Sequence, residues 1–219
     1  MSFKHFGGGD SYALRIDHVL YAVRDLDVAG AEFAERYGLA SLPGGTHPGW
    51  GTANRIIPLG ASYLELIAAV DPAEAAASEV GSAVLEAVAD GDRLLGWCAA
   101  TDDLEGVARR LELDVVPGAR TRPDGSTLSW RLAGTAVGLK SGAFPFFIEW
   151  EGPPSLHPGA AVAEHRVEPL GFAWVEVTGD EPRLREWLGD ADLPLRVADG
   201  PPSLSRVAIE TAGGPIVVL

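Results

Sequence analysis

The chain has 219 residues, 47% of them apolar and 22% charged, so it can bury a sizeable core as one domain or two small ones. Its formal net charge of -14 is not relieved by any basic cluster, which excludes nucleic acid and membranes as expected partners and favours a small-molecule ligand. The single cysteine, Cys98, excludes an internal disulfide and fits a cytoplasmic protein.

The first 70 residues predict a strand, a helix and further strands. Residues 1–12 are glycine-rich and are expected to be a flexible leader. An apolar strand follows at 15–23. Asp25 or Asp27 can cap a helix that continues to about Tyr37, where Gly38 can end it. Strands are then expected at 51–58 and 62–68, with room for a short strand near 39–42.

The same order of elements recurs twice along the chain. The alanine-rich segment 72–90 carries apolar residues at helical spacing and predicts an amphipathic linker helix. After it, the second copy comprises a strand at 94–100, a helix at 103–111, and strands at 114–116, 127–132 and 146–150. The third copy comprises a strand at 172–178, a helix at 180–188 and a closing hairpin at 205–210 and 215–219. The expected fold is therefore α+β, built from three βαβββ units.

These copies suggest a division into domains. Units 13–70 and 94–152, with the linker helix 72–90, are expected to form one domain at 13–152. The third unit, at 170–219, is expected to be structural.

Three polar side chains interrupt strands that are otherwise apolar. His18 lies in the run Ile-Asp-His-Val, Glu65 in Tyr-Leu-Glu-Leu-Ile, and Glu149 in Phe-Phe-Ile-Glu-Trp. An unpaired polar group in a buried strand is costly, so the three predict one shared site. One histidine and two carboxylates would suit Fe, Mn, Zn, Ni or Co and leave positions open for substrate. The alternative is a hydrogen-bonded histidine and two solvated carboxylates.

The repeated unit, with its DHV and YLEL motifs and the segment 44–55, resembles the glyoxalase-like branch of the vicinal oxygen chelate superfamily. This resemblance implies that the first two units pair into an open barrel around a divalent metal, with the third unit appended. It also implies a lyase, isomerase or dioxygenase acting on a small oxygenated substrate. The alternative function is non-catalytic binding of an antibiotic or toxin, and sheet edges left by such units favour a homodimer.

The resemblance assigns roles position by position. His18 and Glu65 match the two ligands of the first unit, and Glu149 matches the last-strand carboxylate of the second. The fourth ligand position falls on Gly96, which offers no donor, and the third unit has Phe172 and Val218 there.

His47, on a glycine-rich loop, is a candidate to replace the missing ligand or to act as general base, against the alternative of an exposed loop histidine. Glu149 and His47 are thus the expected catalytic residues. Alternatively, the site binds no metal and its polar groups hydrogen-bond a ligand.

Further residues are candidates for substrate binding. Asn54, Arg55 and Arg131 could orient a carboxylate or phosphate, and Trp50 could form an aromatic wall. The alternative for the two arginines is a surface position at sheet edges. His157 and His165, in the loop before the third unit, are expected to be exposed.

Overall fold

A computed structural model describes residues 13–122 and 125–218, so the expected leader at 1–12 lies outside the described residues. The first unit follows the predicted order of elements. The short strand that was expected near 39–42 is longer than predicted. The elements of the unit are β1 (Arg15–Ala22), α1 (Leu26–Tyr37), β2 (Leu42–His47), β3 (Thr52–Pro58) and β4 (Tyr63–Ala69). The carboxylate of Asp25 accepts hydrogen bonds from the first turn of α1, and Gly38 ends the helix at a φ of 71°. Both caps are as predicted.

The second unit contains one helix that the sequence did not predict. Its elements are β5 (Arg93–Ala100), α4 (Leu104–Leu111), β6 (Val115–Thr121), β7 (Thr127–Ala133), α5 (Thr135–Ser141) and β8 (Phe146–Trp150). The eight strands form a barrel in the order β1-β4-β3-β2-β6-β7-β8-β5. The α+β fold is confirmed, and the expected open barrel is closed by pairing of β1 with β5 and of β2 with β6 at Thr46 and Thr121.

The connection between the first and second units was predicted to be one helix, but it is divided into shorter helices. It consists of α2 (Pro72–Ala76), α3 (Glu79–Ala87) and the 3₁₀ turn η1 (Val88–Asp90). Asp71 caps α2, and the hydroxyl of Ser78 accepts a hydrogen bond from the N–H of Gly81 at the start of α3. A second N-cap begins a second helix, so the division follows from the serine inside the alanine-rich run.

The third unit has the predicted order of elements but pairs its strands differently. After the short turns η2 (Pro154–Leu156) and η3 (Pro158–Ala160), it consists of β9 (Pro169–Thr178), α6 (Glu181–Leu188), β10 (Leu195–Ala198), β11 (Ser203–Thr211) and β12 (Ile216–Val218). The sheet order is β10-β9-β11-β12, and β10 runs parallel to β9. In the first unit the first strand instead pairs with the last.

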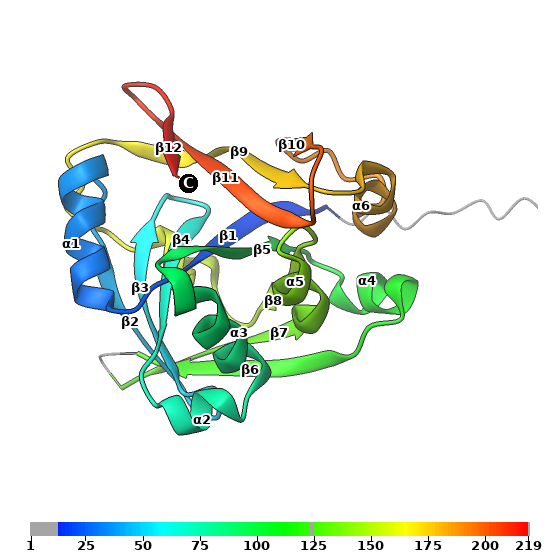
Figure 1. The fold of residues 1–219 in the computed structure, drawn as a ribbon, viewed down its shortest axis with the longest axis horizontal. Helices are drawn as coiled ribbons and strands as arrows, with labels where there is room; N and C mark the ends of the chain where they lie inside the picture. The colour runs from blue at the N-terminus through cyan, green and yellow to red at the C-terminus, as the bar shows by residue number, and fades with distance from the viewer. Residues whose placement is uncertain (1–12, 123–124, 219) are drawn as a thin grey trace, which may run out of the picture.

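This small sheet lies across one side of the barrel, as Figure 1 shows. Its apolar residues, among them Val175 and Val207, share a core with Val19, Leu64 and Trp97 of the barrel strands. Strands β1, β4 and β5 are therefore buried on both faces, which explains their nearly continuous apolar sequences. No helix in the described part of the chain has the length and apolar character of a membrane span.

Gly51 fixes the approach of β3 to helix α2, and its replacement tests this packing. Its φ is +64°, its carbonyl accepts hydrogen bonds from the N–H groups of Val70 and Asp71, and an added Cβ would lie 2.3 Å from the Ala75 nitrogen. We expect Gly51→Ala to lower the free energy of unfolding by about 2–4 kcal/mol, measured by urea denaturation. The control Gly60→Ala also has a positive φ but open space around it, so about 1 kcal/mol is expected. Equal losses would contradict the packing argument.

Candidate functional site

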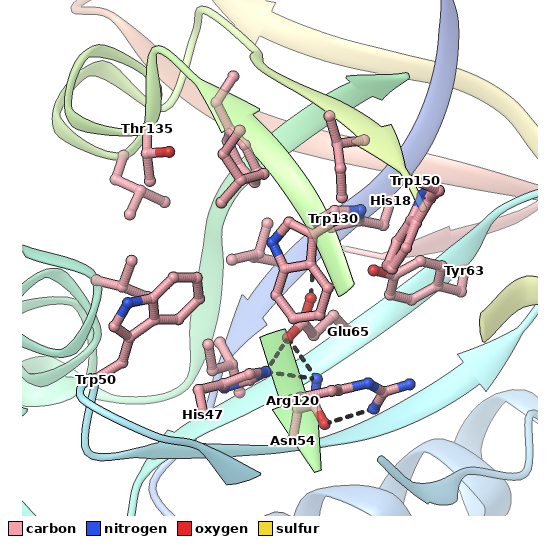
Figure 2. A pocket seen from close by; sticks show the side chains of 17 residues that line it. His18, His47, Trp50, Asn54, Tyr63, Glu65, Arg120, Trp130, Thr135 and Trp150 are labelled. Atoms are coloured by element: carbon pink, nitrogen blue, oxygen red, sulfur yellow. Dashed lines mark hydrogen bonds and ion pairs between the residues drawn. The ribbon is translucent and has the colours of Figure 1, made fainter. Parts of the chain in front are cut away.

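The barrel encloses a cavity of about 50 Å³ with a polar side and an apolar side. The polar side is formed by strands β1 to β4 and β6, and the apolar side by β7, β8 and the helices α3 and α5. The polar groups, which Figure 2 shows gathered around one carboxylate, are those of His18, His47, Asn54, Glu65 and Arg120. Each of these five side chains belongs to a residue that is at least nine-tenths buried.

Strand register brings His18 and Glu65 together. In the parallel pair β1 and β4, Leu20 lies opposite Glu65 and His18 opposite Tyr63. Side chains alternate along β4, so Tyr63, Glu65 and Ile67 all line the cavity, as the sequence pattern predicts. Nε2 of His18 lies 3.7 Å from Oε2 of Glu65, and the imidazole stacks on the Tyr63 ring with centroids 4.7 Å apart.

Asp17 fixes the orientation of His18. It occupies a bulge in the pairing of β1 with β5, which lets its fully buried carboxylate reach back to its neighbour. Oδ1 accepts a hydrogen bond from Nδ1 of His18 at 2.7 Å, and Oδ2 accepts from Nε1 of Trp150 and Nε2 of His157, both at 3.0 Å. In the neutral imidazole this leaves the Nε2 lone pair of His18 facing the cavity.

The charge of Asp17 is retained despite its burial. Burial alone would raise the pKa of this carboxyl, but hydrogen bonds from His157 and His18 hold it well below its usual range. The ring of His157 accepts at Nδ1 from the N–H of Gly159, at 3.1 Å, so its Nε2–H is the donor to Asp17.

A second network fixes the amide of Asn54 and, through it, His47. Arg120 can only donate, so its Nη1 donates to Oδ1 of Asn54 at 3.1 Å. Nδ2 of Asn54 then donates to Oε1 of Glu65 at 2.7 Å and faces Nε2 of His47 at 3.3 Å. Nε2 of His47 is therefore the acceptor, and its Nδ1–H donates to Oγ1 of Thr52 at 2.9 Å.

His47 is held in its neutral form. Burial lowers its pKa to about 4, against the opposing influence of Glu65 and with a smaller contribution from Arg120. The expectation of a loop position is wrong: His47 ends strand β2 and is 4% exposed. Its Nε2 lies 3.9 Å from Oε1 of Glu65, so the two histidines face different oxygens of one carboxylate.

Glu149 does not lie in the cavity with His18 and Glu65. The expected site of three converging residues is therefore not formed. The residues of β8 that line the cavity are Phe146, Ile148 and Trp150, so alternation places Glu149 on the outer face. There its carboxylate accepts a hydrogen bond from Arg131, which also pairs with Glu105. Arg131 is thus an outer-face residue and not a wall of the cavity.

The other predicted residues divide between the cavity and the surface. Asn54 and Trp50 line the cavity, whereas Arg55 turns outward to Asp27 and Ser41. His157 and His165 are not the exposed residues that were expected. Both rings are partly buried, and His165 bonds to the backbone of Ala40 and Pro58.

The second unit contributes an apolar wall in place of metal ligands. A Cβ added to Gly96, which lies opposite Leu20, would lie 3.4 Å from Cδ2 of Leu139, because helix α5 covers this position. Within residues 13–122 and 125–218, no three His, Cys, Asp or Glu side chains converge closely enough to hold a metal ion. His18 and Glu65 supply two donors. The Nε2 of His47, the predicted replacement for the missing ligand, lies 3.9 Å from Glu65 but already accepts from Asn54, so the residues present do not complete the metal centre that the resemblance implies.

Sequence reasoning missed several residues of this site. Arg120 follows Pro117 and Gly118, which indicate a turn although β6 continues through them. Gly118 leaves room for the indole of Trp130, which lies across it. Among the described residues, two buried side-chain polar atoms have no hydrogen-bond partner, Nε1 of Trp130 and Oγ1 of Thr135, and both residues line this cavity.

Comparisons with known proteins agree with this architecture. The family described as a glyoxalase-like domain matches residues 16–191. A hypothetical protein from Staphylococcus aureus has a similar structure, with a TM-score of 0.70 and 18% identity over 93% of this chain and 98% of that one.

Two methylmalonyl-CoA epimerases also match part of this chain. The enzyme from Mycobacterium tuberculosis is 21% identical, with a TM-score of 0.45 over 65% of this chain and 90% of its own. A Streptomyces coelicolor variant in complex with 2-nitronate-propionyl-CoA is 19% identical, with a TM-score of 0.48 over 65% of this chain and 100% of its own. No curated protein sequence matches significantly.

The low pKa of His47 makes stability depend on pH. Between its ordinary value of 6.5 and about 4, the unfolded chain binds a proton that the folded site does not, so stability is lost as pH falls through this range. We expect His47→Gln to remove this loss, which amounts to about 3 kcal/mol. Urea unfolding of both proteins from pH 7.5 to pH 4 measures the effect. Parallel stability curves for the two proteins would contradict a neutral, buried His47.

Proposed function

The chain belongs to the glyoxalase-like domain family of the vicinal oxygen chelate superfamily, and on this basis we propose that it is an isomerase or lyase that binds a small oxygenated molecule in the barrel. The observation that carries the proposal is the buried carboxylate of Glu65, placed between two oriented histidines at the polar side of the cavity. Proton transfer beside a carbonyl group is the chemistry that this arrangement supports best.

Glu65 is the group suited to take the proton. Asn54 holds Oε1, so Oε2 is the oxygen available to a substrate. Oε2 takes the proton from the carbon beside the substrate carbonyl, and the C–H electron pair forms a double bond as the carbonyl electrons move to oxygen. In an isomerisation, Glu65 then returns the proton to the former carbonyl carbon, while the proton of the adjacent hydroxyl passes to the former carbonyl oxygen and a new carbonyl forms at the adjacent carbon. In a lyase reaction, the carbonyl re-forms instead, and a leaving group departs with its bonding electron pair from the carbon β to the carbonyl and takes the proton from Glu65.

Other residues orient the catalytic carboxylate and the substrate and exclude water. His47, neutral and bonded to Asn54 and Thr52, holds the Asn54 amide in place beside Glu65. The unpartnered Nε1–H of Trp130 is a donor for a substrate oxygen. The cavity is narrow, so the reacting part of the substrate is small and its apolar part packs against Trp50 and Trp150.

A divalent metal is the other chemistry that the family resemblance implies. His18 and Glu65 would be its two protein ligands, and a metal held there would act as a Lewis acid on a substrate oxygen. Because the donor set lacks a third protein ligand, no step of the proposed reaction is assigned to a metal.

Binding without turnover is the second candidate function. It is favoured by the second unit, where Leu132, Leu139 and Phe146 form an apolar wall in place of a second set of polar groups. In that case a ligand would raise the melting temperature in the presence of chelator and no reaction would follow.

Exchange of substrate protons with deuterated water tests the role of Glu65. With hydroxyacetone and 2-oxobutanoate as probes, we expect the wild-type protein to catalyse exchange at the carbon beside the carbonyl, measured by proton NMR. Glu65→Gln should lower the rate by about a hundredfold or more, because the amide cannot accept the proton. The matched control Glu149→Gln changes a carboxylate on the outer face and should leave the rate unchanged. If both variants exchange at the wild-type rate, Glu65 is not the base.

Metal content tests the incomplete donor set. Protein purified without chelator and then dialysed should carry less than one equivalent of Fe, Mn, Zn, Ni or Co by elemental analysis, because two protein ligands hold such ions weakly. Titration with each ion should raise the melting temperature of wild-type and His18→Ala protein by the same small amount. One equivalent that survives dialysis and is lost in His18→Ala would show that the site completes a metal centre.

A further inference from the structure

Arg120 is a buried cation that the proposed reaction has not used. The residue is 6% exposed, and within the described part of the chain its one hydrogen bond is the donation from Nη1 to Asn54. A guanidinium has five N–H donors, and those on Nε and Nη2 have no acceptor among the described residues; neither nitrogen is fully buried, so a ligand can reach both. Burial lowers the pKa of Arg120, with Tyr63 and Glu65 opposing this effect.

The burial of Arg120 distinguishes it from the arginines that form ion pairs. Arg55 pairs with Asp27, Arg131 with Glu105 and Glu149, and Arg206 with Glu176, all closer to the surface. No carboxylate of the described residues forms an ion pair with Arg120. Because an unpaired buried charge is costly, its retention in a cavity indicates that an anion binds there.

Asn54 keeps Arg120 and Glu65 from neutralising each other. Its amide lies between them, accepting from Nη1 of Arg120 at 3.1 Å and donating to Oε1 of Glu65 at 2.7 Å. Figure 2 shows these three side chains in sequence along the polar side of the cavity. Both charges thus remain available to a ligand.

The backbone leaves space for this arrangement at Gly44 of strand β2. A Cβ at this position would lie 2.0 Å from Oδ1 of Asn54 and 2.5 Å from Nη1 of Arg120. Any side chain at position 44 would therefore displace the amide or the guanidinium. The space left by Gly44 is thus filled by the contact between Asn54 and Arg120. This geometric observation does not depend on the pKa of Arg120.

We propose that Arg120 binds the carboxylate of the substrate, so that the substrate class is a small 2-oxo carboxylic acid with an apolar tail. The planar guanidinium suits the two oxygens of a carboxylate. With Asp17 and Glu65 already contributing two negative charges, a monoanion is favoured over a phosphate dianion.

The inference deepens the proposed function and rests on it for the chemical step. Asn54 spans the distance from the guanidinium to Glu65, so a carboxylate on Arg120 directs the oxo carbon next to it, and the following carbon whose proton the oxo group acidifies, toward the Glu65 carboxylate. The tail then extends toward Trp50, Trp130 and Trp150, which line the same cavity. Arg120 is in this way a residue that determines specificity.

Matched acid and amide probes test the inference through binding alone. The probes are 2-oxobutanoate with 2-oxobutanamide, and benzoate with benzamide, titrated against the intrinsic fluorescence of the tryptophans and by NMR. We expect wild-type protein to bind each acid about ten- to a hundredfold more tightly than its amide. Arg120→Met should lose this preference, and Arg120→Lys should keep part of it because the charge remains without the second pair of donors.

The control variant is Arg131→Met, which removes an arginine from the outer face of the neighbouring strand and should keep the full preference. Thermal unfolding shows whether each variant is folded; Arg120→Met should be at least as stable as wild type without ligand, since it removes an unpaired buried charge. Equal binding of acid and amide by wild-type protein, no binding of either acid, or a preference that persists in Arg120→Met would each overturn the proposal.

The two proposals fail in different ways. If Glu65→Gln retains proton exchange while the acid preference depends on Arg120, the assigned base is wrong and the substrate class stands. If exchange depends on Glu65 but hydroxyacetone reacts as well as 2-oxobutanoate in wild type and in Arg120→Met, the base stands and the substrate class is wrong.

Discussion

The buried carboxylate of Asp17 is the interaction on which the arrangement of the site depends. Its three hydrogen bonds join His18 in β1, Trp150 at the end of β8, and His157 in the loop that leads to the third unit. A charge with no exposure is stable here only because all three donors are present. The same contacts set the tautomer of His18, bring an aromatic wall of the cavity into place and fix the loop against the barrel. The carboxylate of Asp17 therefore sets both the positions of these side chains and the tautomer of His18.

Where the sequence carries a distinct local signal, prediction succeeded. Helix α1 has an aspartate cap and a C-terminal glycine, and the alternation around Glu65 placed that side chain in the cavity. Prediction failed where two patterns look alike. In Phe-Phe-Ile-Glu-Trp both faces of the strand are apolar, so the sequence does not reveal which face is inside, and a one-residue difference puts Glu149 on the outer face. The glycines before His47 indicate a loop although they lie in β2.

The remaining differences arise from tertiary packing. Because the small sheet covers the outer face of β1, β4 and β5, these strands are apolar throughout, and a polar residue in them stands out more than it would in a half-exposed strand. The order of elements suggested a third copy of the same unit, but element order does not determine which strands pair. Arg120 could not be identified from a strand expected to end at Val116, and the sequence does not show that its guanidinium occupies the space left by Gly44.

Helix α5 has a stereochemical consequence. By covering Gly96 with Leu139, it leaves the ionisable groups of the cavity on the side of β1 to β4 and β6, facing an apolar wall. A planar enolate held between these two sides would meet Glu65 on one face only. A proton removed from that face would return to the same face, so suprafacial transfer with retained configuration is the stereochemical course open to this barrel, since inversion needs a proton donor on each face.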